Sequence, residues 1–382
     1  MWLIIYLWCT VALFIPYATI ILLYRKWFLK LSPFLIPASF KPQIKFSIII
    51  PARNEEANIP ACLESIFRQK YPTGLFEVII IDDHSTDSSS AIVQQLQVQH
   101  SNLKLIRLAD EIDGKALNSY KKKAIERAID IATGDWIITT DADCMMTEKW
   151  IASFAAIIQQ KDPVFVAAPV AFSNDGGIIS TFQCIDFTSL QGITAASVSA
   201  GFHSMCNGAN LAYRKDAFNE VGGFNGIDSI ASGDDMLLMN KIKKRFPSKI
   251  AFLFSREAII TTDPMPDWKS FLNQRIRWAS KADQFKDKSI FWVLFLVYFF
   301  NLFLFIMPFL SFFYPLLFLY WLAFLVLKSF VELLFIIPVA ASFGQTFMWQ
   351  LPLLQPMHIA YTVMAGWLGK FGTYQWKGRK VK

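Results

Sequence analysis

Two long stretches without a charged residue limit what this chain can fold into. The first covers residues 1–24 and the second residues 289–327. A membrane-spanning helix needs about 20 apolar residues, so each stretch is long enough to cross a bilayer. The second is too long for one crossing, because a single helix of that length would span about 58 Å, nearly twice a hydrocarbon core of about 30 Å. The sequence therefore predicts an integral membrane protein.

The first stretch is expected to be an uncleaved N-terminal anchor over residues 1–24. A cleaved signal peptide would begin with basic residues and end in a small-residue cleavage site, whereas this segment begins Met-Trp-Leu-Ile and ends Leu-Leu-Tyr. Arg25, Lys26 and Lys30 follow directly. Because basic residues concentrate on the cytoplasmic side of a membrane, we expect the following domain to be cytoplasmic.

Residues 289–369 are expected to hold the remaining membrane helices. The uncharged run should fold back between Pro308 and Pro315, and Lys328 and Glu332 should mark the return. A basic tail over residues 370–382 should also be cytoplasmic, which requires an even number of spans. Four spans are favoured, and two spans with an interfacial or re-entrant stretch are the alternative.

The distribution of charge supports the membrane interpretation over nucleic-acid binding. Hydrophobic residues make up 54% of the 382 residues and charged residues 18%, against roughly 45–50% and about 25% in soluble domains. The formal charge is +7, but residues 41–288 carry a net charge of −1, so the basic surplus borders the apolar runs. The five cysteines include no Cys-x-x-Cys pair, which favours a cytosolic domain with unpaired thiols.

The middle of the chain reads as an α/β domain over residues 41–288. Apolar runs typical of buried strands alternate with helical patterns, which indicates a parallel sheet with helices on both faces. The strands are expected at residues 46–50, 76–81, 103–107, 136–140 and 164–169, and the helices at 57–68, 88–100, 115–132 and 148–160. In such sheets ligands bind beyond the carboxyl ends of the strands.

Polar clusters follow three of these strands. Residues 53–56 come after the first, residues 82–85 after the second, and Asp141-Ala142-Asp143 after the fourth. Each cluster alone is compatible with a solvated loop or a helix cap. Since all three fall at carboxyl ends of one predicted sheet, we expect them to converge on a ligand site.

The two carboxylates of Asp141 and Asp143 are candidate metal ligands. Oxygen ligands suit Mg²⁺ or Mn²⁺, which takes one or two carboxylates together with waters and substrate phosphates. The alternative is an ordinary acidic turn. His84 has no second histidine at metal-binding spacing, so zinc is not expected.

Three further motifs have a functional and a structural interpretation. Lys115 opens a predicted helix and could meet a phosphate, or could be a surface lysine. Asp234 and Asp235 begin another helix, where one could cap it and the other serve as a general base. Residues 274–278, Gln-Arg-Ile-Arg-Trp, could anchor the chain at the membrane interface or contact a diphosphate and an acceptor. The chain has neither Walker nor Gly-x-Gly-x-x-Gly phosphate loops.

In these motifs the chain resembles the membrane-integrated branch of glycosyltransferase family 2. The matching stretches occur in family order at residues 47–56, 78–87, 114–118, 141–143, 207–214, 222–224, 233–235 and 274–278, with a further match at 376–379. Any one motif is weak, but eight in order are specific. The resemblance implies a GT-A fold, a nucleotide-sugar donor, most simply a UDP-sugar, and Mg²⁺ or Mn²⁺.

The resemblance also implies roles for individual residues. Asp141 and Asp143 would bind the metal, and Asp235 would be the general base. Donor-binding residues would be Ala52, Arg53, Glu55, Asp83, Lys115, Asp141, Ala142, Gln274, Arg275 and Arg277. The acceptor side would be formed by Asn207, Gly208, Asp234 and Trp278, with residues 268–282 as an interfacial helix. The residue before the base is often Glu in this family and is Asp234 here, which puts an acceptor role for Asp234 in doubt.

The expected reaction is a single displacement that inverts the anomeric centre, with a lipid-linked or membrane-embedded acceptor. A processive polysaccharide synthase that exports its product is the first alternative, and the sequence motifs occur in both kinds of relative. An inactive membrane scaffold that keeps the fold is the second. Bilayer lipid and a lipid or glycan acceptor are the expected partners, and nucleic acid is not.

Overall fold

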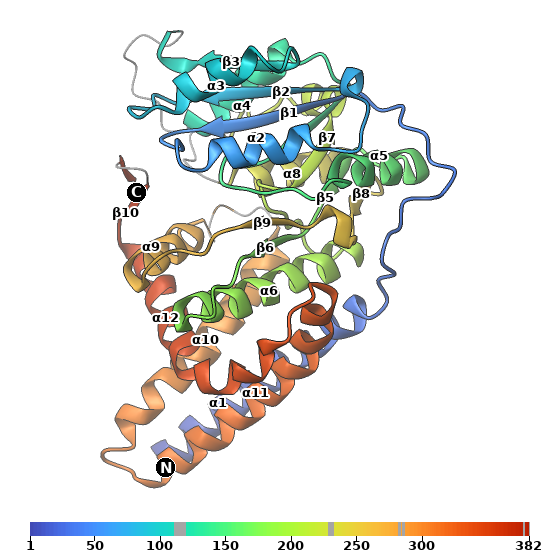
Figure 1. Cartoon of the computed structure of the whole chain (residues 1–382). Coiled ribbons are helices and arrows are strands. Elements are labelled where there is room, and N and C mark those ends of the chain that lie inside the picture. The colour runs from blue at the N-terminus through green and yellow to red at the C-terminus, as the bar shows by residue number, and fades with distance from the viewer. Residues whose placement is uncertain (111–119, 228–232, 282–283, 285–286, 377–378, 382) are drawn as a thin grey trace. The chain divides into compact units, whose positions relative to one another are not determined.

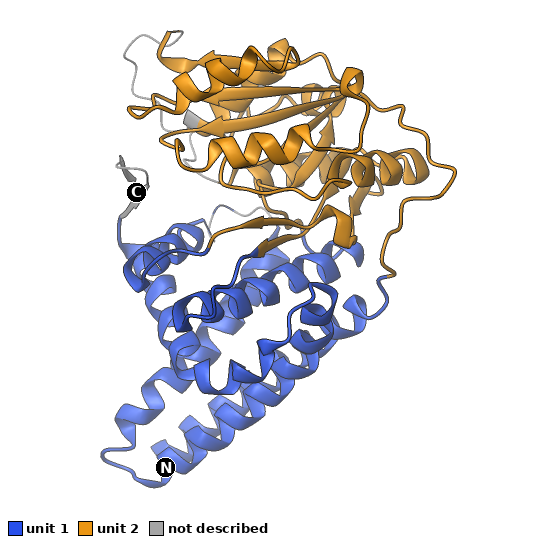
Figure 2. Ribbon diagram, in the orientation of Figure 1, with its two compact units in different colours: residues 1–31, 172–203, 264–382 blue, residues 32–171, 204–263 orange. Residues whose placement is uncertain are grey.

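The computed structural model divides the chain into two units, each assembled from separate segments (Figure 2). One, here called the sheet unit, comprises residues 32–171 and 204–263, and the other, the helical unit, comprises residues 1–31, 172–203 and 264–382. The structure describes residues 1–110, 120–227, 233–281, 284, 287–376 and 379–381. Each unit is considered by itself below.

The sheet unit is built on one seven-stranded sheet within the described residues, in the order β3-β2-β1-β4-β7-β5-β8 (Figure 1). The strands are β1 Phe46–Ala52, β2 Phe76–Asp82, β3 Leu103–Arg107, β4 Trp136–Thr139, β5 Phe165–Ala167, β7 Leu211–Arg214 and β8 Ile250–Phe252. β1 pairs in parallel with β2 and β4, and β2 with β3. β7 runs antiparallel to both β4 and β5. A separate pair is formed by β6 (Val170–Phe172) and β9 (Ile260–Thr262).

Burial explains why the central strands read as continuous apolar runs. Every residue of β2 is buried, and β1 is buried except at Pro51, because helices cover both faces of the sheet. The helices of this unit are α2 Ile59–Phe67, α3 Ser89–Gln97, α4 Tyr120–Ile131, α5 Trp150–Lys161, α7 Lys215–Glu220 and α8 Asp234–Arg245, with short 3₁₀ turns at Thr73–Leu75, Leu108–Asp110 and Arg256–Ala258.

The predicted α/β class with a mostly parallel sheet is confirmed. All five expected strands and the four expected helices are present, although residues 111–119 at the start of the expected 115–132 helix lie outside the described residues. The sequence analysis did not identify β7 as a strand. It has four residues and enters the sheet antiparallel between β4 and β5, so it does not follow the strand–helix alternation used to find the others.

The helical unit contains α1 Trp2–Phe28, α6 Ile178–Ser199, α9 Trp268–Ala279, α10 Lys288–Leu310, α11 Leu316–Ser342 and α12 Leu351–Phe371, and a 3₁₀ turn at Phe347–Gln350. Its chain end carries the hairpin of β10 (Tyr374–Trp376) and β11 (Arg379–Val381). Among the described helices, α1, α10 and α11 are long and apolar enough to cross a membrane. The expected anchor over residues 1–24 therefore corresponds to α1.

Residues 288–371, all of them described, form three long helices and not the favoured four. The chain does turn back between Leu310 and Leu316, as expected, but Pro338 lies inside α11 and does not end it. Lys328 and Glu332 also lie inside α11. They form an ion pair with each other, so the helix can continue through both positions without exposing an unpaired charge. Of these three helices, α10 and α11 are candidate membrane spans by length and composition, and the number of spans stays a prediction.

The expected catalytic domain over residues 41–288 is not one unit. Its residues 172–203 and 264–288 belong to the helical unit. The physical reason is packing: α6 packs on α1, α11 and α12, and α9, which corresponds to the expected interfacial helix, packs on α12. The chain therefore leaves and re-enters the sheet unit.

Candidate active site

The polar residues that follow β1 and β2 are joined by hydrogen bonds. The backbone N–H of Asp83 donates to the carbonyl of Ala52 at 2.8 Å. Arg53 Nη1 donates to the backbone carbonyl of Asp83 at 2.9 Å and lies 3.9 Å from its carboxylate. Asp83 is buried and Arg53 is half-buried. Because β1 and β2 are parallel neighbours, their two loops form one wall at the carboxyl edge of the sheet.

The backbone of these two loops is held in an uncommon conformation. Asn54 and His84 both have positive φ, of 52° and 57°. The side-chain oxygen of Asn54 accepts from the backbone N–H of Thr86 at 2.8 Å, and His84 Nδ1 lies 3.0 Å from the Asp83 carboxylate. Left-handed residues other than glycine are uncommon and persist where surrounding bonds fix them, which these contacts do.

The Asp141-Ala142-Asp143 segment follows β4, next to β1. Asp143 is exposed, Asp141 is half-buried and Ala142 is buried. Burial raises the pKa of the Cys62 thiol, and the negative charges of Asp143, Asp141 and Glu55 raise it further. Both aspartates and Glu55 therefore lie close enough to one buried sulfur to act on it electrostatically, which brings the ends of β1 and β4 together.

Lys121 on α4 is a candidate site residue that the sequence analysis did not single out. Its Nζ lies 2.8 Å from Asp141 Oδ1. Burial alone would lower the pKa of Lys121, but the charges of Asp141, Asp234 and Asp235 hold it well above the ordinary lysine range. This ammonium group thus connects the acidic segment after β4 with the start of α8.

A positional signal could have identified Lys121. In a strand–helix–strand unit the helix begins at the edge where the first strand ends, so its first turns lie beside the ligand site. Lys121 lies near the beginning of α4, which precedes β4. Lys115, the lysine that the sequence analysis favoured, lies outside the described residues.

Asp235 is fixed at the start of α8. The backbone N–H of Gly208 donates to Asp235 Oδ2 at 2.8 Å, and that of Met236 to Oδ1 at 2.8 Å. A Cβ added at Gly208 would lie 3.4 Å from Oδ2, which is a tight contact. Thr139 at the end of β4 donates its hydroxyl to the carbonyl of Gly208 at 2.9 Å. Each carboxylate oxygen has two lone pairs, so these bonds orient Asp235 and are compatible with proton acceptance.

Asn207 shapes the turn before Gly208. Its side-chain oxygen accepts from the backbone N–H of Ala209 at 3.0 Å, and its carbonyl from the N–H of Asn210 at 3.0 Å. Burial raises the pKa of the neighbouring Cys206 thiol, and the charges of Asp235 and Asp234 raise it further. The expected acceptor-side residues Asn207, Gly208 and Asp234 therefore lie beside Asp235.

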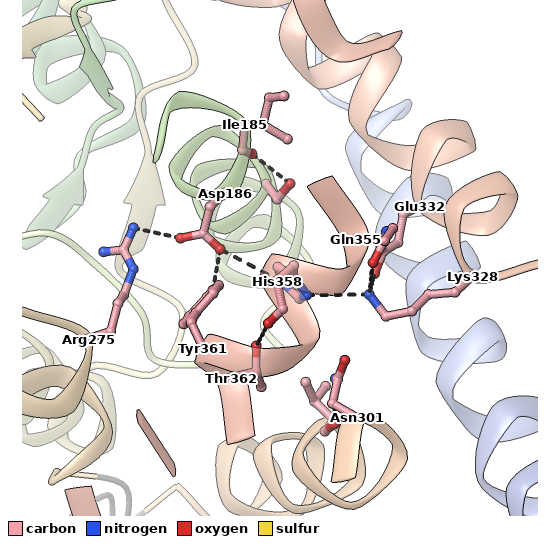
Figure 3. Close-up of polar contacts among 12 residues, drawn as sticks. Ile185, Asp186, Arg275, Asn301, Lys328, Glu332, Gln355, His358, Tyr361 and Thr362 are labelled. Carbon is pink, nitrogen blue, oxygen red and sulfur yellow. Dashed lines mark hydrogen bonds and ion pairs between the residues drawn. The ribbon is translucent and has the colours of Figure 1, made fainter. Parts of the chain in front are cut away.

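The Gln-Arg-Ile-Arg-Trp segment lies on α9 of the helical unit. Gln274, Arg277 and Trp278 are half-buried. Arg275 is buried, and its Nη2 lies 2.6 Å from Asp186 Oδ2 (Figure 3). The expectation that Arg275 contacts the donor is not supported by this position, because its guanidinium is committed to an ion pair inside the helical unit.

The residues after β4 have the chemistry of a Mg²⁺ or Mn²⁺ site. Two carboxylates separated by one residue supply hard oxygen ligands, and the exposure of Asp143 leaves room for further ligands. Within the described part of the chain, no group of three or more His, Cys, Asp or Glu residues is arranged to hold a metal.

Comparison with known proteins gives consistent matches. The chain matches Glycosyl transferase family 2 over residues 47–222 and Glycosyl transferase family group 2 over residues 136–349. Glycosyltransferase AglE of Haloferax volcanii is 27% identical over 190 residues, which is 50% of this chain and 58% of AglE. Beta-monoglucosyldiacylglycerol synthase of a Nostoc species is 29% identical over 128 residues, 34% of this chain and 26% of the synthase. These matches cover less than two thirds of the relatives' own length.

A solved structure shares the fold over nearly the whole chain. The mannosyltransferase PcManGT from Pyrobaculum calidifontis, in complex with GDP-Man and Mn²⁺, aligns with a TM-score of 0.57 and 18% identity, covering 94% of this chain and 97% of that one. The second family match spans more than half of the chain. The chain therefore belongs to glycosyltransferase family 2 and has a GT-A fold.

Proposed function

We propose that this protein is a membrane-bound, inverting glycosyltransferase that moves a sugar from a nucleotide-sugar, most simply a UDP-sugar, to a lipid-linked or membrane-embedded acceptor. The observation that carries the proposal is the electrostatic grouping of Asp141, Asp234 and Asp235 around the Lys121 ammonium at the carboxyl edge of the sheet. It joins the candidate metal-binding segment to the candidate base.

The loops after β1 and β2 are suited to the nucleoside of the donor. Arg53, paired with Asp83, is a cation beside a buried carboxylate. A carboxylate at this position can accept hydrogen bonds from a base edge or a ribose hydroxyl. Ala52 and Glu55 complete this side, and Ala142, being small and buried, leaves room at the end of β4.

Asp235 is suited to remove a proton from the acceptor hydroxyl. Two backbone N–H groups orient its carboxylate, which a positioned general base requires. The deprotonated oxygen would form a bond to the anomeric carbon from the face opposite the leaving diphosphate, whose bond to that carbon breaks. One displacement of this kind converts an α-linked donor into a β-linked product.

Charge on the leaving diphosphate needs stabilisation as the bond breaks. Asp141 and Asp143 would hold a Mg²⁺ or Mn²⁺ ion, which when bound would supply positive charge to the diphosphate oxygens. Gln274 and Arg277 of α9 are proposed to contact the same group, and Trp278 to form a wall on the acceptor side. Arg275 has a different role, developed below.

The acceptor is proposed to be lipid because of the helices that accompany the sheet unit. α1, α10 and α11 are each long and apolar enough to cross a bilayer. We propose that they anchor the protein in the cytoplasmic membrane, where a lipid acceptor would be available.

A donor screen on the purified, detergent-solubilised full chain tests the proposal. UDP-glucose, UDP-N-acetylglucosamine, UDP-galactose and GDP-mannose would each be incubated with Mn²⁺ and membrane lipid extract. We expect nucleoside diphosphate release that requires one donor and lipid, with a new glycolipid detected by mass spectrometry. Release of nucleotide with none of the donors would reject the proposal, and a long polymer on a gel would replace it with a processive synthase.

A further inference from the structure

A continuous series of polar contacts runs through the helical unit. It involves residues on five helices, and Figure 3 shows its central part. The participating residues are Tyr17 on α1, Asp186 on α6, Arg275 on α9, Lys328 and Glu332 on α11, and Gln355, His358 and Tyr361 on α12. Lys328 and Glu332 lie in α11, which is long and apolar enough to cross a membrane, and ionisable groups in such helices are costly and usually serve function.

One end of the series is the pair of Lys328 and Glu332. Lys328 Nζ donates to Glu332 Oε1 at 2.7 Å and to the side-chain oxygen of Gln355 at 2.7 Å. The Glu332 carboxylate also accepts from the hydroxyl of Tyr17 and from the amide of Gln355. The Lys328 side chain has no exposed surface, so this pair ties α1, α11 and α12 together in a dry environment.

The other end is the pair of Asp186 and Arg275. Asp186 Oδ2 lies 2.6 Å from Arg275 Nη2, and its Oδ1 accepts from the hydroxyl of Tyr361. His358 lies between the two pairs, with Nε2 at 3.8 Å from Asp186 and Nδ1 at 3.4 Å from Lys328. The side chains of Asp186 and Arg275 are only 5% and 4% exposed.

The net charge of this series indicates whether it binds a charged ligand or supports the structure. Asp186 and Glu332 bring two acidic groups, and Arg275 and Lys328 bring two basic groups, each in an ion pair. A site for a charged ligand would leave an excess of one sign. The balanced pairs therefore indicate that the series orients its members and does not bind a ligand charge.

Arg275 is the member of this series that contacts Trp278, the residue proposed to line the acceptor side. Its guanidinium carbon lies 4.2 Å from the centre of the Trp278 ring and 4.7 Å from that of Phe271. Arginine stacks on aromatic rings through its planar face, and residues three and four apart on a helix are neighbours. The guanidinium is thus held by Asp186 on one side and covers Trp278 on the other.

We propose that Asp186 is a positioning residue for the acceptor side of the active site: it fixes the Arg275 guanidinium, and through it the indole ring of Trp278. This inference rests on the proposed function, in which Trp278 lines the acceptor side. Without the carboxylate, the buried guanidinium loses its counter-charge and turns toward water, so the indole loses the contact that defines its orientation. The nucleoside-binding loops after β1 and β2, which belong to the sheet unit, should be unaffected.

The first test uses steady-state kinetics with UDP-glucose as donor and dioctanoylglycerol in micelles as acceptor. Asp186→Asn should raise the acceptor KM at least tenfold and leave the donor KM within twofold of wild type. Arg275→Lys keeps a cation for Asp186 but lacks the planar face, so it should show the same acceptor defect with a smaller loss of thermal stability. A purely structural role would lower the fraction of active enzyme and leave both KM values unchanged.

The second test does not require activity. Protein labelled with fluorotryptophan gives one fluorine NMR resonance for each tryptophan. The resonance of Trp278 is assigned as the one missing from the spectrum of Trp278→Phe. That resonance should shift in Asp186→Asn and Arg275→Lys. Asp175→Asn is the matched control, because Asp175 is an exposed acid of the same unit. Its side-chain oxygen accepts a hydrogen bond from the Gly177 N–H, and an asparagine oxygen can accept the same bond. This variant should leave the Trp278 resonance in place.

The outcomes separate the two proposals. An unshifted Trp278 resonance in folded Asp186→Asn would overturn the positioning role, whatever the activity. If Asp186→Asn does not fold, Arg275→Lys decides by the same resonance. If the Trp278 resonance shifts in Asp186→Asn but the wild-type protein releases no nucleotide with any donor, the positioning of Trp278 is retained and the proposed reaction is rejected. In an Arg275→Met background, Asp186→Asn should add less than twofold to the acceptor KM, since the positioned group is already absent.

Discussion

The two units use charged residues in opposite ways. In the sheet unit, the carboxylates of Asp141, Asp234 and Asp235 act on one ammonium group, that of Lys121, so these four groups carry a net negative charge. In the helical unit, Asp186 pairs with Arg275, and Glu332 with Lys328, so those four groups are neutral together. The acidic group lies at the edge of a sheet with Asp143 exposed, whereas in the neutral group Asp186, Arg275 and Lys328 are buried among helices and Glu332 is half-buried.

This difference shows how the setting of a charge indicates its role. Carboxylates that lie close together at an accessible edge gain favourable interactions when a cation or a proton-donating substrate arrives. In balanced, buried pairs each charge already has its counter-charge, and removing one partner is costly because the other remains charged. The first arrangement is typical of a reaction site, and the second of a support for one.

The comparison predicts the largest effect on activity at Asp235. Replacing a positioned general base typically costs 10²–10⁴ in rate, so Asp235→Asn should lower kcat by about 10³ while UDP still binds. Nucleotide release and calorimetric titration with UDP measure the two properties. Asp216→Asn, at an exposed acid of the same unit, is the control and should match wild type. Turnover of Asp235→Asn near the wild-type rate would remove the base assignment.

A second prediction concerns the metal. Asp143→Ala removes an exposed carboxylate whose proposed partner is Mn²⁺, so UDP affinity in the presence of Mn²⁺ should fall about 100-fold. Affinity measured with a chelator present should hardly differ from wild type. Calorimetric titration with and without Mn²⁺ gives both values. Equal Mn²⁺-dependent affinity in the two proteins would show that Asp143 is not a ligand.

A third prediction concerns the Lys121 ammonium group, which lies beside Asp141. Lys121→Met should lower kcat/KM for the donor about tenfold, because it removes the charge that organises Asp141 relative to α8. Lys123→Met is the control, since Lys123 is an exposed lysine on the same helix. If both variants keep the wild-type kcat/KM, Lys121 has a structural role like that of the buried ion pairs. The difference in charge between the two units would then not reflect a difference in function.

A fourth prediction concerns an ion pair of balanced charge inside the sheet unit, formed by Glu77 and Lys104. Glu77 lies 2.7 Å from Lys104 and accepts from Ser47 and Thr133. Burial alone would raise the pKa of Glu77, but these partners lower it to about 2. Glu77→Gln should therefore lower the free energy of unfolding by about 2 kcal/mol and leave kcat unchanged in the folded fraction.

The pH dependence of this pair has a definite sign. The carboxyl pKa is lower in the folded protein than the ordinary value of 4.5, so the stabilisation is complete above that pH and is lost as the pH falls toward 2. Thermal unfolding between pH 6 and 3 should show a smaller acid loss for Glu77→Gln than for wild type. Parallel curves for the two proteins would contradict the role of Glu77.

The sequence predicted most of the central sheet and the edge at which its strands end. Buried parallel strands require long apolar runs, and β1 and β2 have them, so their ends and the polar residues beyond them could be located. β7 could not be found in this way, because it is short and enters antiparallel from α6, a helix of the other unit. Likewise, no local pattern distinguished Lys121 from other lysines of its basic helix.

What the sequence determined by itself was the class of protein: apolar runs predicted helices long enough to span a membrane, strand–helix alternation predicted the α/β sheet, and acidic residues after strands predicted where a candidate site lies. The tertiary structure decided the partners. Arg275 and Arg277 are alike in sequence, two residues apart on α9, yet Arg275 is buried against Asp186. The physical reason is that apolar periodicity is encoded locally, whereas a charge acquires its role from groups far away in the chain, and these become neighbours only after folding.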